Sequence, residues 1–326
     1  MAKILITGIA GFIGASVGRR LAQSGHQVVG VDNLNTYYDP NRTRARINGV
    51  REAGDLAFHE TDIADYDTFG NCEDVRDCDV VIHLAAQAGV RYSLENPFAY
   101  AKSNLMGHLS VLELVRHCSP SPRLVYASSS SVYGSNTETP FSETAAVDAP
   151  VSLYAATKRA DELMSAAYSR LYNIEQIGLR FFTVYGPWGR PDMAYWSFTQ
   201  KILSGEPIPV FNEGQLQRDF TYIDDVVDGV IATALNPFKG TSDIPHEIYN
   251  IGNNRSVPLL SFINELENAL GKKAKMDLLP MQPGDVLTTY ADIDALARDY
   301  GFEPKTPLNV GIERFVSWYQ DYVQSD

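Results

Sequence analysis

The fold of this chain is decided near its start, by the stretch KILITGIAGFIG at residues 3–14. An apolar run leads directly into three evenly spaced glycines. Gly8 permits a tight turn, Gly11 lets the backbone approach a pyrophosphate at a helix N-terminus, and Gly14 permits close packing of that helix on the strand. Because the glycines lie between a predicted strand and a predicted amphipathic helix, they indicate a dinucleotide-binding crossover rather than a ligand-free turn.

Apolar runs and helical patterns alternate through the first half of the chain. The runs are continuous rather than alternating, which is typical of strands covered on both faces. Strands are predicted at Lys3–Thr7, Gln27–Val31, Leu56–His59, Val80–Leu84, Arg123–Ala127 and Glu175–Phe181, and helices at Gly11–Ser24, Pro97–Cys118 and Ser152–Tyr172. This order predicts an α/β fold with a parallel, doubly wound (Rossmann) sheet and right-handed crossovers.

Beyond about Tyr185 proline and glycine become frequent and the alternation stops. We therefore expect a dinucleotide-binding domain over residues 1–184 and a smaller, mixed α/β substrate domain over residues 185–326. The helical pattern at Asp224–Leu235 suggests that a segment near 212–250 returns to the first domain, so the substrate domain is expected to be discontinuous.

Composition narrows the possible partners. The net charge of -13 over 326 residues argues against a nucleic-acid partner. No apolar stretch approaches the roughly 20 residues that a membrane span needs, so no membrane partner is expected. Cys72, Cys78 and Cys118 are sparse and lack the spacing of metal ligands, which suggests reduced thiols in a cytoplasmic protein without a metal site.

Two carboxylates follow the predicted strands on the cofactor side. Asp32 closes the second strand, about 20 residues beyond the glycines, where a carboxylate accepts hydrogen bonds from an adenosine ribose and repels a 2′-phosphate. Its position predicts NAD rather than NADP. Asp62 follows the third strand and is either a contact near the adenine or a helix cap, with equal support for both.

Tyr154 and Lys158 form a Y-x-x-x-K pattern in a predicted helix, so the phenol and the ammonium share one face. A nearby positive charge favours the ionised phenol, which makes Tyr154 a candidate acid/base for a sugar hydroxyl. The serines at 128–131 end the fifth predicted strand. Ligands of open parallel sheets bind at the carboxyl ends of strands, so Ser129 is expected beside Tyr154.

These residues, with HLAA at 83–86, Asn104 and RDF at 218–220, resemble the NAD-dependent sugar-nucleotide epimerase/dehydratase family of extended short-chain dehydrogenases. The resemblance covers nearly the whole chain. It implies that Ser129 orients the sugar 4-hydroxyl, that Tyr154 is the base and that Lys158 holds the nicotinamide ribose. It also implies a set of cofactor contacts, namely Gly8, Gly11, Phe12, Ile13, Gly14, Asp32, Asn33, Asp62, Ile63, Leu84, Ala85, Ala86, Asn104, Ser128, Tyr154, Lys158 and Phe181.

Three longer stretches, AQAGVRYS at 86–93, LRFFTVYGPWGRPDM at 179–193 and LPMQPGDV at 279–286, resemble the bacterial UDP-glucuronate 4-epimerases. That resemblance implies conversion of UDP-glucuronate to UDP-galacturonate through a 4-keto sugar, in a homodimer paired through the helices at Pro97–Cys118 and Ser152–Tyr172. Substrate contacts are expected from Ser129, Ser130, Thr183, Arg190, Arg218, Asp285 and Arg91. Arg218 would meet the diphosphate, and Arg190, with Thr183 and the serines, would hold the sugar carboxylate, with Arg91 as a weaker candidate.

Other readings stay open. A neutral-sugar epimerase for UDP-glucose and UDP-galactose is the main alternative, and a UDP-glucuronate decarboxylase is a lesser one. The dehydratases and decarboxylases that the chain resembles carry acidic residues after the strand-five hydroxyl, where this chain has Ser130 and Ser131. A non-catalytic NAD-binding protein on the same fold is a further possibility, against which the intact Ser129, Tyr154 and Lys158 speak.

Overall fold

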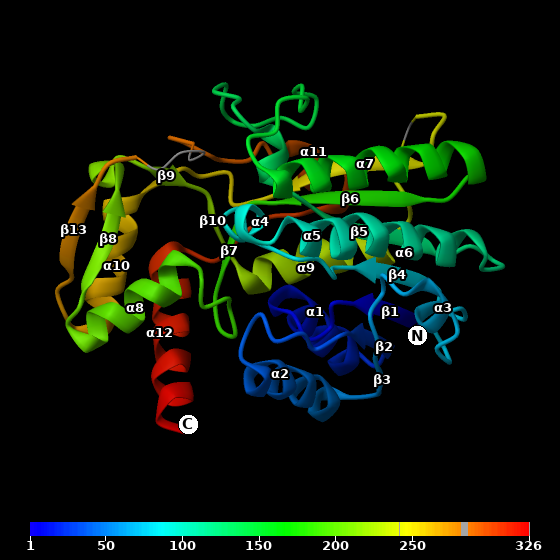
Figure 1. Ribbon diagram of the computed structural model, residues 1–326, viewed down its shortest axis with the longest axis horizontal. Coiled ribbons are helices and arrows are strands. Elements are labelled where there is room, and N and C mark those ends of the chain that lie inside the picture. Colours follow the sequence, from blue (N-terminus) through cyan, green and yellow to red (C-terminus); the bar gives the residue numbers. More distant parts are fainter. Residues whose placement is uncertain (241, 282–285, 326) are drawn as a thin grey trace.

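A seven-stranded, wholly parallel sheet forms the centre of the computed structural model, which describes residues 1–240, 242–281 and 286–325. The strand order is β11-β6-β5-β4-β1-β2-β3 (Figure 1). The strands are β1 (Lys3–Thr7), β2 (Gln27–Asp32), β3 (Leu56–Glu60), β4 (Val80–His83), β5 (Arg123–Ser129), β6 (Gln176–Phe181) and β11 (His246–Ile251). The predicted doubly wound fold is therefore confirmed.

Both faces of this sheet are buried. Along β1, Ile4 and Ile6 pack with one hydrophobic cluster while Leu5 packs with another on the opposite face. Helices α1 (Phe12–Gln23) and α9 (Ile223–Leu235) cover the first face, with α2 (Pro40–Ala53) outside α1, and α6 (Gly107–Arg116) packs on the second. Successive strand side chains point to opposite faces, so a two-sided apolar environment requires the uninterrupted apolar runs seen in the sequence.

Helices α7 (Leu153–Tyr172), α3 (Tyr66–Gly70) and α5 (Pro97–Tyr100) lie on the same side as α6 (Figure 1). Where one helix was predicted at Pro97–Cys118, the structure has α5, a π-helical segment at Ala101–Met106, and α6. Six strands were predicted and all six are present. The seventh strand of this sheet, β11, was not predicted. It follows a proline- and glycine-rich stretch, in a part of the chain where helices and strands no longer alternate regularly.

The remaining elements form a smaller assembly of two-stranded sheets and helices beside the carboxyl ends of the large sheet (Figure 1). Its strand pairs are β7 (Thr183–Tyr185) with β10 (Phe220–Tyr222), β8 (Pro207–Phe211) with β13 (Lys275–Leu279), and β9 (Gln217–Arg218) with β12 (Val257–Pro258). Its helices are α8 (Ala194–Ser204), α10 (Leu259–Leu270) and α12 (Leu308–Ser325). Two short helices, α4 (Tyr92–Glu95) and α11 (Asp294–Tyr300), complete the fold.

The chain crosses between the two parts more than once. After β10 it re-enters the large sheet, where α9 packs on α1 and β11 pairs with β6. The predicted division at residue 184, with a returning segment near 212–250, stays a prediction. Among the described residues, no helix combines the length and apolarity that crossing a membrane requires.

Candidate active site

A cavity of about 1030 Å³ opens at the carboxyl ends of the central strands, between the large sheet and the smaller assembly. The glycine loop, the ends of β2, β4 and β5, the first turns of α7, and the segment after β6 all contribute to its wall. Most residues predicted for the site line it, namely Gly8, Gly11, Phe12, Ile13, Gly14, Asp32, Asn33, Asp62, Ile63, Leu84, Ala85, Ala86, Arg91, Ser128, Ser129, Ser130, Tyr154, Lys158, Phe181, Thr183, Arg190 and Arg218.

The glycine loop has the close backbone approaches that its sequence predicts. Gly8 has φ +74°, and a Cβ atom there would lie 2.6 Å from the Ala85 nitrogen. At Gly14 a Cβ atom would lie 2.1 Å from the Gly8 carbonyl oxygen. No side chain caps the N-terminus of α1, and its first turn has no acidic residue. Its unpaired N–H groups therefore offer a place for an anionic pyrophosphate, which fits a dinucleotide.

Asp32 lies at the end of β2 and is held by the loop that it faces. Its carboxylate accepts hydrogen bonds from the Ala10 nitrogen at 3.0 Å and the Leu34 nitrogen at 3.0 Å. Burial raises the pKa of Asp32 above its ordinary value. Asp62 also lines the cavity, and it pairs with the Lys102 ammonium at 2.8 Å. Burial opposes that charge, but the hydrogen bond from Lys102 leaves the pKa of Asp62 lowered.

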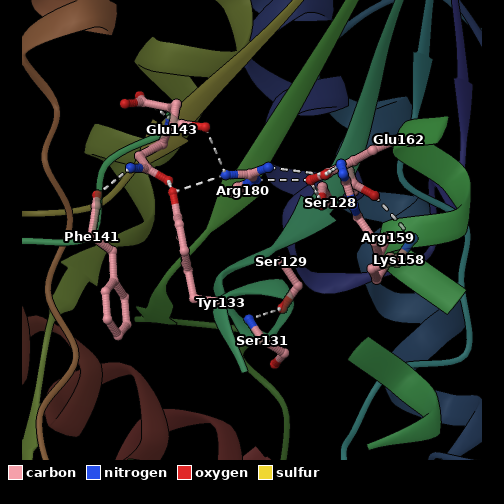
Figure 2. Close-up of polar contacts among 12 residues, drawn as sticks. Ser128, Ser129, Ser131, Tyr133, Phe141, Glu143, Lys158, Arg159, Glu162 and Arg180 are labelled. Carbon is pink, nitrogen blue, oxygen red and sulfur yellow. Dashed lines mark hydrogen bonds and ion pairs between the residues drawn. The ribbon is translucent and has the colours of Figure 1, made fainter. Parts of the chain in front are cut away.

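A buried polar network supports the end of β5 (Figure 2). The Ser128 hydroxyl donates to the Glu162 carboxylate at 2.6 Å. Arg180 donates to both oxygens of Glu162, from Nε at 2.8 Å and from Nη2 at 3.0 Å. Ser128 pairs with Arg180 in the register of β5 and β6, so neighbouring strands bring these groups together. Bidentate pairing of this kind fixes both position and direction.

The same network extends to the third strand. Arg180 donates to the Tyr133 hydroxyl at 3.1 Å, which donates to Asn250 Oδ1 at 2.6 Å. Asn250 occupies the register position beside Arg180 on β11. Burial opposes the Glu162 charge, but Arg180 outweighs it, so the pKa of Glu162 is lowered below 4.5. Three adjacent strands are thus tied together directly beneath the serines of the site.

Tyr154 and Lys158 both border the cavity from the start of α7. The Lys158 ammonium donates to the Ala127 carbonyl at 2.9 Å and to Asp161 at 3.1 Å. Two of its three donors are therefore used, and one remains for a ligand hydroxyl. Burial raises the pKa of Asp161 to about 6, against the effect of Lys158. The Ser129 hydroxyl accepts from the Ser131 nitrogen at 3.2 Å, which leaves its own proton free to donate.

Arg190 faces the cavity from the turn that follows β7. Its Nη2 atom pairs with Asp192 Oδ2 at 3.3 Å, and the Tyr38 hydroxyl donates to Asp192 Oδ1 at 2.9 Å. Tyr38 belongs to the segment between β2 and α2, far from Arg190 in the sequence. Burial disfavours the Arg190 charge, but Asp192 outweighs it and the pKa of Arg190 is raised.

Arg46 of α2 holds the backbone of the same turn. Its guanidinium donates to the Ala10 carbonyl at 3.2 Å and to the Gly189 carbonyl at 3.1 Å, and it also contacts the Trp188 carbonyl. Burial lowers the pKa of Arg46 to about 10. One side chain therefore joins the glycine loop of the predicted cofactor site to the turn that carries Arg190.

Asn104, Arg218 and Arg91 make contacts within the chain that the sequence did not predict. Asn104 does not line the cavity, because it is buried behind it and bonds the Gln87 backbone and the Thr157 hydroxyl. Arg218 donates to the carbonyls of Val286, at 2.7 Å, and Leu287. Arg91 is exposed and lies over the Phe211 ring at 5.5 Å. Asp285 lies outside the described residues.

Sequence reasoning missed Glu162, Arg180, Arg46, Tyr38 and Asp192. A charged pair inside two apolar patterns was a usable signal for Glu162 and Arg180, because charged side chains are almost never fully buried unless they are paired. Nothing in the sequence connects Tyr38 or Arg46 with a turn some 140 residues away.

Known proteins resemble this chain along its whole length. The model of the family described as "NAD dependent epimerase/dehydratase family" matches residues 4–252. Protein CapI of Staphylococcus aureus is 46% identical, over 98% of this chain and 99% of that protein. UDP-glucuronate 4-epimerase 4 of Arabidopsis thaliana is 44% identical, over 99% of this chain and 76% of that protein.

Solved structures agree with the sequence relatives. The UDP-glucuronic acid 4-epimerase of Bacillus cereus, solved in complex with UDP-glucuronic acid and NAD, superposes with a TM-score of 0.88 at 32% identity, over 98% of this chain and 99% of that one. Sequence and structure both lead to one assignment, and the chain belongs to the NAD dependent epimerase/dehydratase family.

Proposed function

We propose that this chain catalyses the NAD-dependent 4-epimerisation of UDP-glucuronate, with UDP-galacturonate as the product. The observation that carries the proposal is the presence, in one cavity, of a Ser–Tyr–Lys set (Ser129, Tyr154 and Lys158) and an arginine, Arg190. The first set suits proton transfer at a sugar hydroxyl, and the second suits a sugar carboxylate. The likeness to 4-epimerases named for UDP-glucuronate supports the same substrate.

Cofactor binding is assigned to the glycine loop and to Asp32. The free N–H groups at the start of α1 would hold the pyrophosphate, and the Asp32 carboxylate would accept from the adenosine ribose. NAD bound there would supply reversible hydride acceptance for the chemistry at sugar C4. The third donor of the Lys158 ammonium is available for the nicotinamide ribose.

Proton handling is assigned to Tyr154 and Ser129. The Tyr154 phenol removes the proton from the sugar O4 as the alcohol becomes a ketone, and it gives a proton back when the alcohol re-forms. The Ser129 hydroxyl, whose proton has no acceptor among the described residues, donates to the same oxygen and orients it. The Ser128–Glu162–Arg180 network keeps this strand end in place during both steps.

The uronate carboxylate is assigned to Arg190, with Thr183 and the serines at 129–130 completing its site. A 4-keto uronate is a β-keto acid and loses CO₂ when its carboxylate bond stands perpendicular to the carbonyl plane. Binding the carboxylate in another orientation therefore protects the intermediate. Arg218 is assigned to the diphosphate, and Arg91 to the outer wall of the cavity.

One incubation separates this function from the alternatives. Purified protein is mixed with UDP-glucuronate, without added NAD, and the products are resolved by chromatography and mass. Formation of UDP-galacturonate supports the proposal. Formation of UDP-xylose with CO₂ would assign a decarboxylase instead, and turnover of UDP-glucose with none of UDP-glucuronate would assign a neutral-sugar epimerase. Absence of every product, with NAD supplied as a control, would leave a non-catalytic NAD-binding protein.

We further propose a homodimer paired through the helices at Pro97–Cys118 and Ser152–Tyr172. Apolar side chains are exposed along these helices, including Phe98 at 83% and Leu171 at 68%, together with Met106 and Leu163. Exposed apolar side chains gathered on a surface are typical of a subunit interface. Changing Phe98→Asp and Leu163→Asp together is expected to yield a monomer in light-scattering measurements. A parental mass for that variant contradicts this interface.

The division into a cofactor domain at 1–184 and a discontinuous substrate domain at 185–326 is retained as a proposal. A cytoplasmic setting is likewise proposed. All three cysteines are free thiols, and burial raises the pKa of each, to about 12 at Cys78. Raised thiol pKa values favour unreactive thiols, which suits a reducing compartment.

A further inference from the structure

Asp192 contacts the guanidinium of Arg190 from one side only. The contact joins Asp192 Oδ2 to Arg190 Nη2 at 3.3 Å, which is longer than an optimal charged hydrogen bond. The other carboxylate oxygen, Oδ1, accepts from the Tyr38 hydroxyl at 2.9 Å. Each oxygen of Asp192 therefore has one partner, and the carboxylate links Tyr38 to Arg190.

This arrangement leaves donors of Arg190 unused. A guanidinium has five N–H donors in a planar fork. The Nη2 atom meets Asp192 and the Met193 sulfur, at 3.0 Å. Within residues 1–240, 242–281 and 286–325, the Nε and Nη1 atoms of Arg190 make no hydrogen bond. Since Arg190 lines the cavity, the three N–H donors on these two atoms remain for an anion that enters it.

The turn that carries Arg190 is tied to the cofactor side of the molecule. Tyr38 follows β2, six residues after Asp32, and Arg46 of α2 holds the backbone carbonyl of Gly189, next to Arg190. Asp192 contacts the Arg190 side chain directly, and Tyr38 acts on it through Asp192.

We propose that Asp192 and Tyr38 are positioning residues for Arg190: they hold its guanidinium at Nη2, which fixes the direction in which its unused N–H groups meet the sugar carboxylate. This inference rests on the proposed function, in which Arg190 binds that carboxylate. It adds a specificity determinant formed by Asp192, in the Arg190 turn, and Tyr38, in the segment beside the proposed NAD ribose site.

The orientation of Arg190 matters because the 4-keto intermediate can also lose CO₂. In the 4-keto uronate, cleavage of the C5–C6 bond releases CO₂ and moves the bonding electron pair into the C4 carbonyl as an enolate, which then takes a proton at C5. That step requires the C5–C6 bond to stand perpendicular to the carbonyl plane. An arginine held in one direction keeps the carboxylate away from that geometry, whereas a freely rotating arginine does not.

The test uses three variants of the full chain with UDP-glucuronate. Asp192→Asn removes the charged contact, Tyr38→Phe removes only the hydrogen bond to Asp192, and Tyr249→Phe is the matched control. Tyr249 also donates to an aspartate, Asp299, at 2.9 Å, but it lies outside the cavity. Three quantities are measured: KM against kcat, the dissociation constant by calorimetry, and the fraction of product that has lost CO₂.

We expect Asp192→Asn to raise KM and the dissociation constant about tenfold and Tyr38→Phe to raise them about threefold, the ranges for a charged and a shared hydrogen bond. Both should raise the CO₂-losing fraction, while Tyr249→Phe matches the parent. Parental or tighter binding in Asp192→Asn and Tyr38→Phe, with an unchanged product fraction, overturns the inference. If the parent chain itself does not convert UDP-glucuronate, the proposed function fails instead, so the two failures are distinguishable.

Discussion

Two arginines, Arg180 behind the site and Arg190 in its wall, are held in contrasting ways. Arg180 is 3% exposed, pairs bidentately with Glu162 and lies in register with residues on both neighbouring strands, β5 and β11. Arg190 is 25% exposed, lies in an irregular turn and touches Asp192 through one atom. The first arginine is part of the frame that fixes the reacting groups, while the second retains donors for a ligand. An arginine whose three nitrogen atoms are all engaged stabilises the fold, whereas an arginine with unused donor atoms can bind a ligand.

The largest expected effect concerns Tyr154, the proposed acid/base of the cavity. Tyr154→Phe removes the phenolic oxygen from the cavity wall without removing any hydrogen bond of the described chain. We expect kcat for UDP-glucuronate to fall about 10³-fold, within the usual range for loss of an acid/base. The free energy of unfolding should stay within about 0.5 kcal/mol of the parent, as for other substitutions outside packed or paired sites. A rate near that of the parent refutes the mechanism.

The next test compares the arginines directly. Arg180→Met leaves the Glu162 carboxylate buried without its main partner, and breaking such a pair costs about 3–5 kcal/mol of stability. Arg190→Met removes one long, partly exposed contact and is expected to cost less than about 1 kcal/mol. Equilibrium unfolding in urea measures both. The double variant Arg180→Met with Glu162→Gln should recover part of the loss, because no unpaired charge remains. Equal destabilisation by the two single variants contradicts the contrast.

A smaller effect is expected for cofactor binding, at the part of the cavity that Asp32 lines. Asp32→Asn removes the negative charge that would accept from the ribose while keeping the size of the side chain. We expect NAD to bind about tenfold more weakly, the scale of one charged hydrogen bond. Calorimetric titration of cofactor-stripped protein measures it, with Asp228→Asn as the control because Asp228 pairs with Arg20 outside the cavity. Unchanged affinity in Asp32→Asn would assign the ribose to another residue.

The smallest expected effect is a pH dependence of the stability that the Glu162–Arg180 ion pair contributes. The pKa of Glu162 is lowered in the folded chain, so its contribution to stability is present above the unfolded value of 4.5 and is lost as the pH falls below it. The difference in unfolding free energy between the parent and Glu162→Gln should therefore be constant near pH 7 and shrink from about pH 4.5 downward. Unfolding curves between pH 7 and pH 3 test this. A difference that grows in acid contradicts the assigned ion pair.

The features that could be predicted from the sequence are those that depend on local spacing. Gly8, Gly14 and Asp32 follow or precede strands in a fixed order, and Tyr154 and Lys158 share a helix face, so spacing alone placed them at one edge of the sheet. It did not predict Arg46 or Tyr38 as partners of the Arg190 turn, because these contacts join segments more than 140 residues apart. The hydrogen bonds of Asn104 with the Gln87 backbone were not predicted either, because they too depend on contacts that spacing does not show.

Hydride return is the central claim, and isotopic labelling tests it most directly. The purified chain is incubated with UDP-glucuronate that carries deuterium at C4, and the product is analysed by mass spectrometry and NMR. The account predicts UDP-galacturonate that retains the deuterium at C4 and all six sugar carbons. Product with hydrogen from solvent at C4, or a five-carbon sugar as the main product, would contradict it.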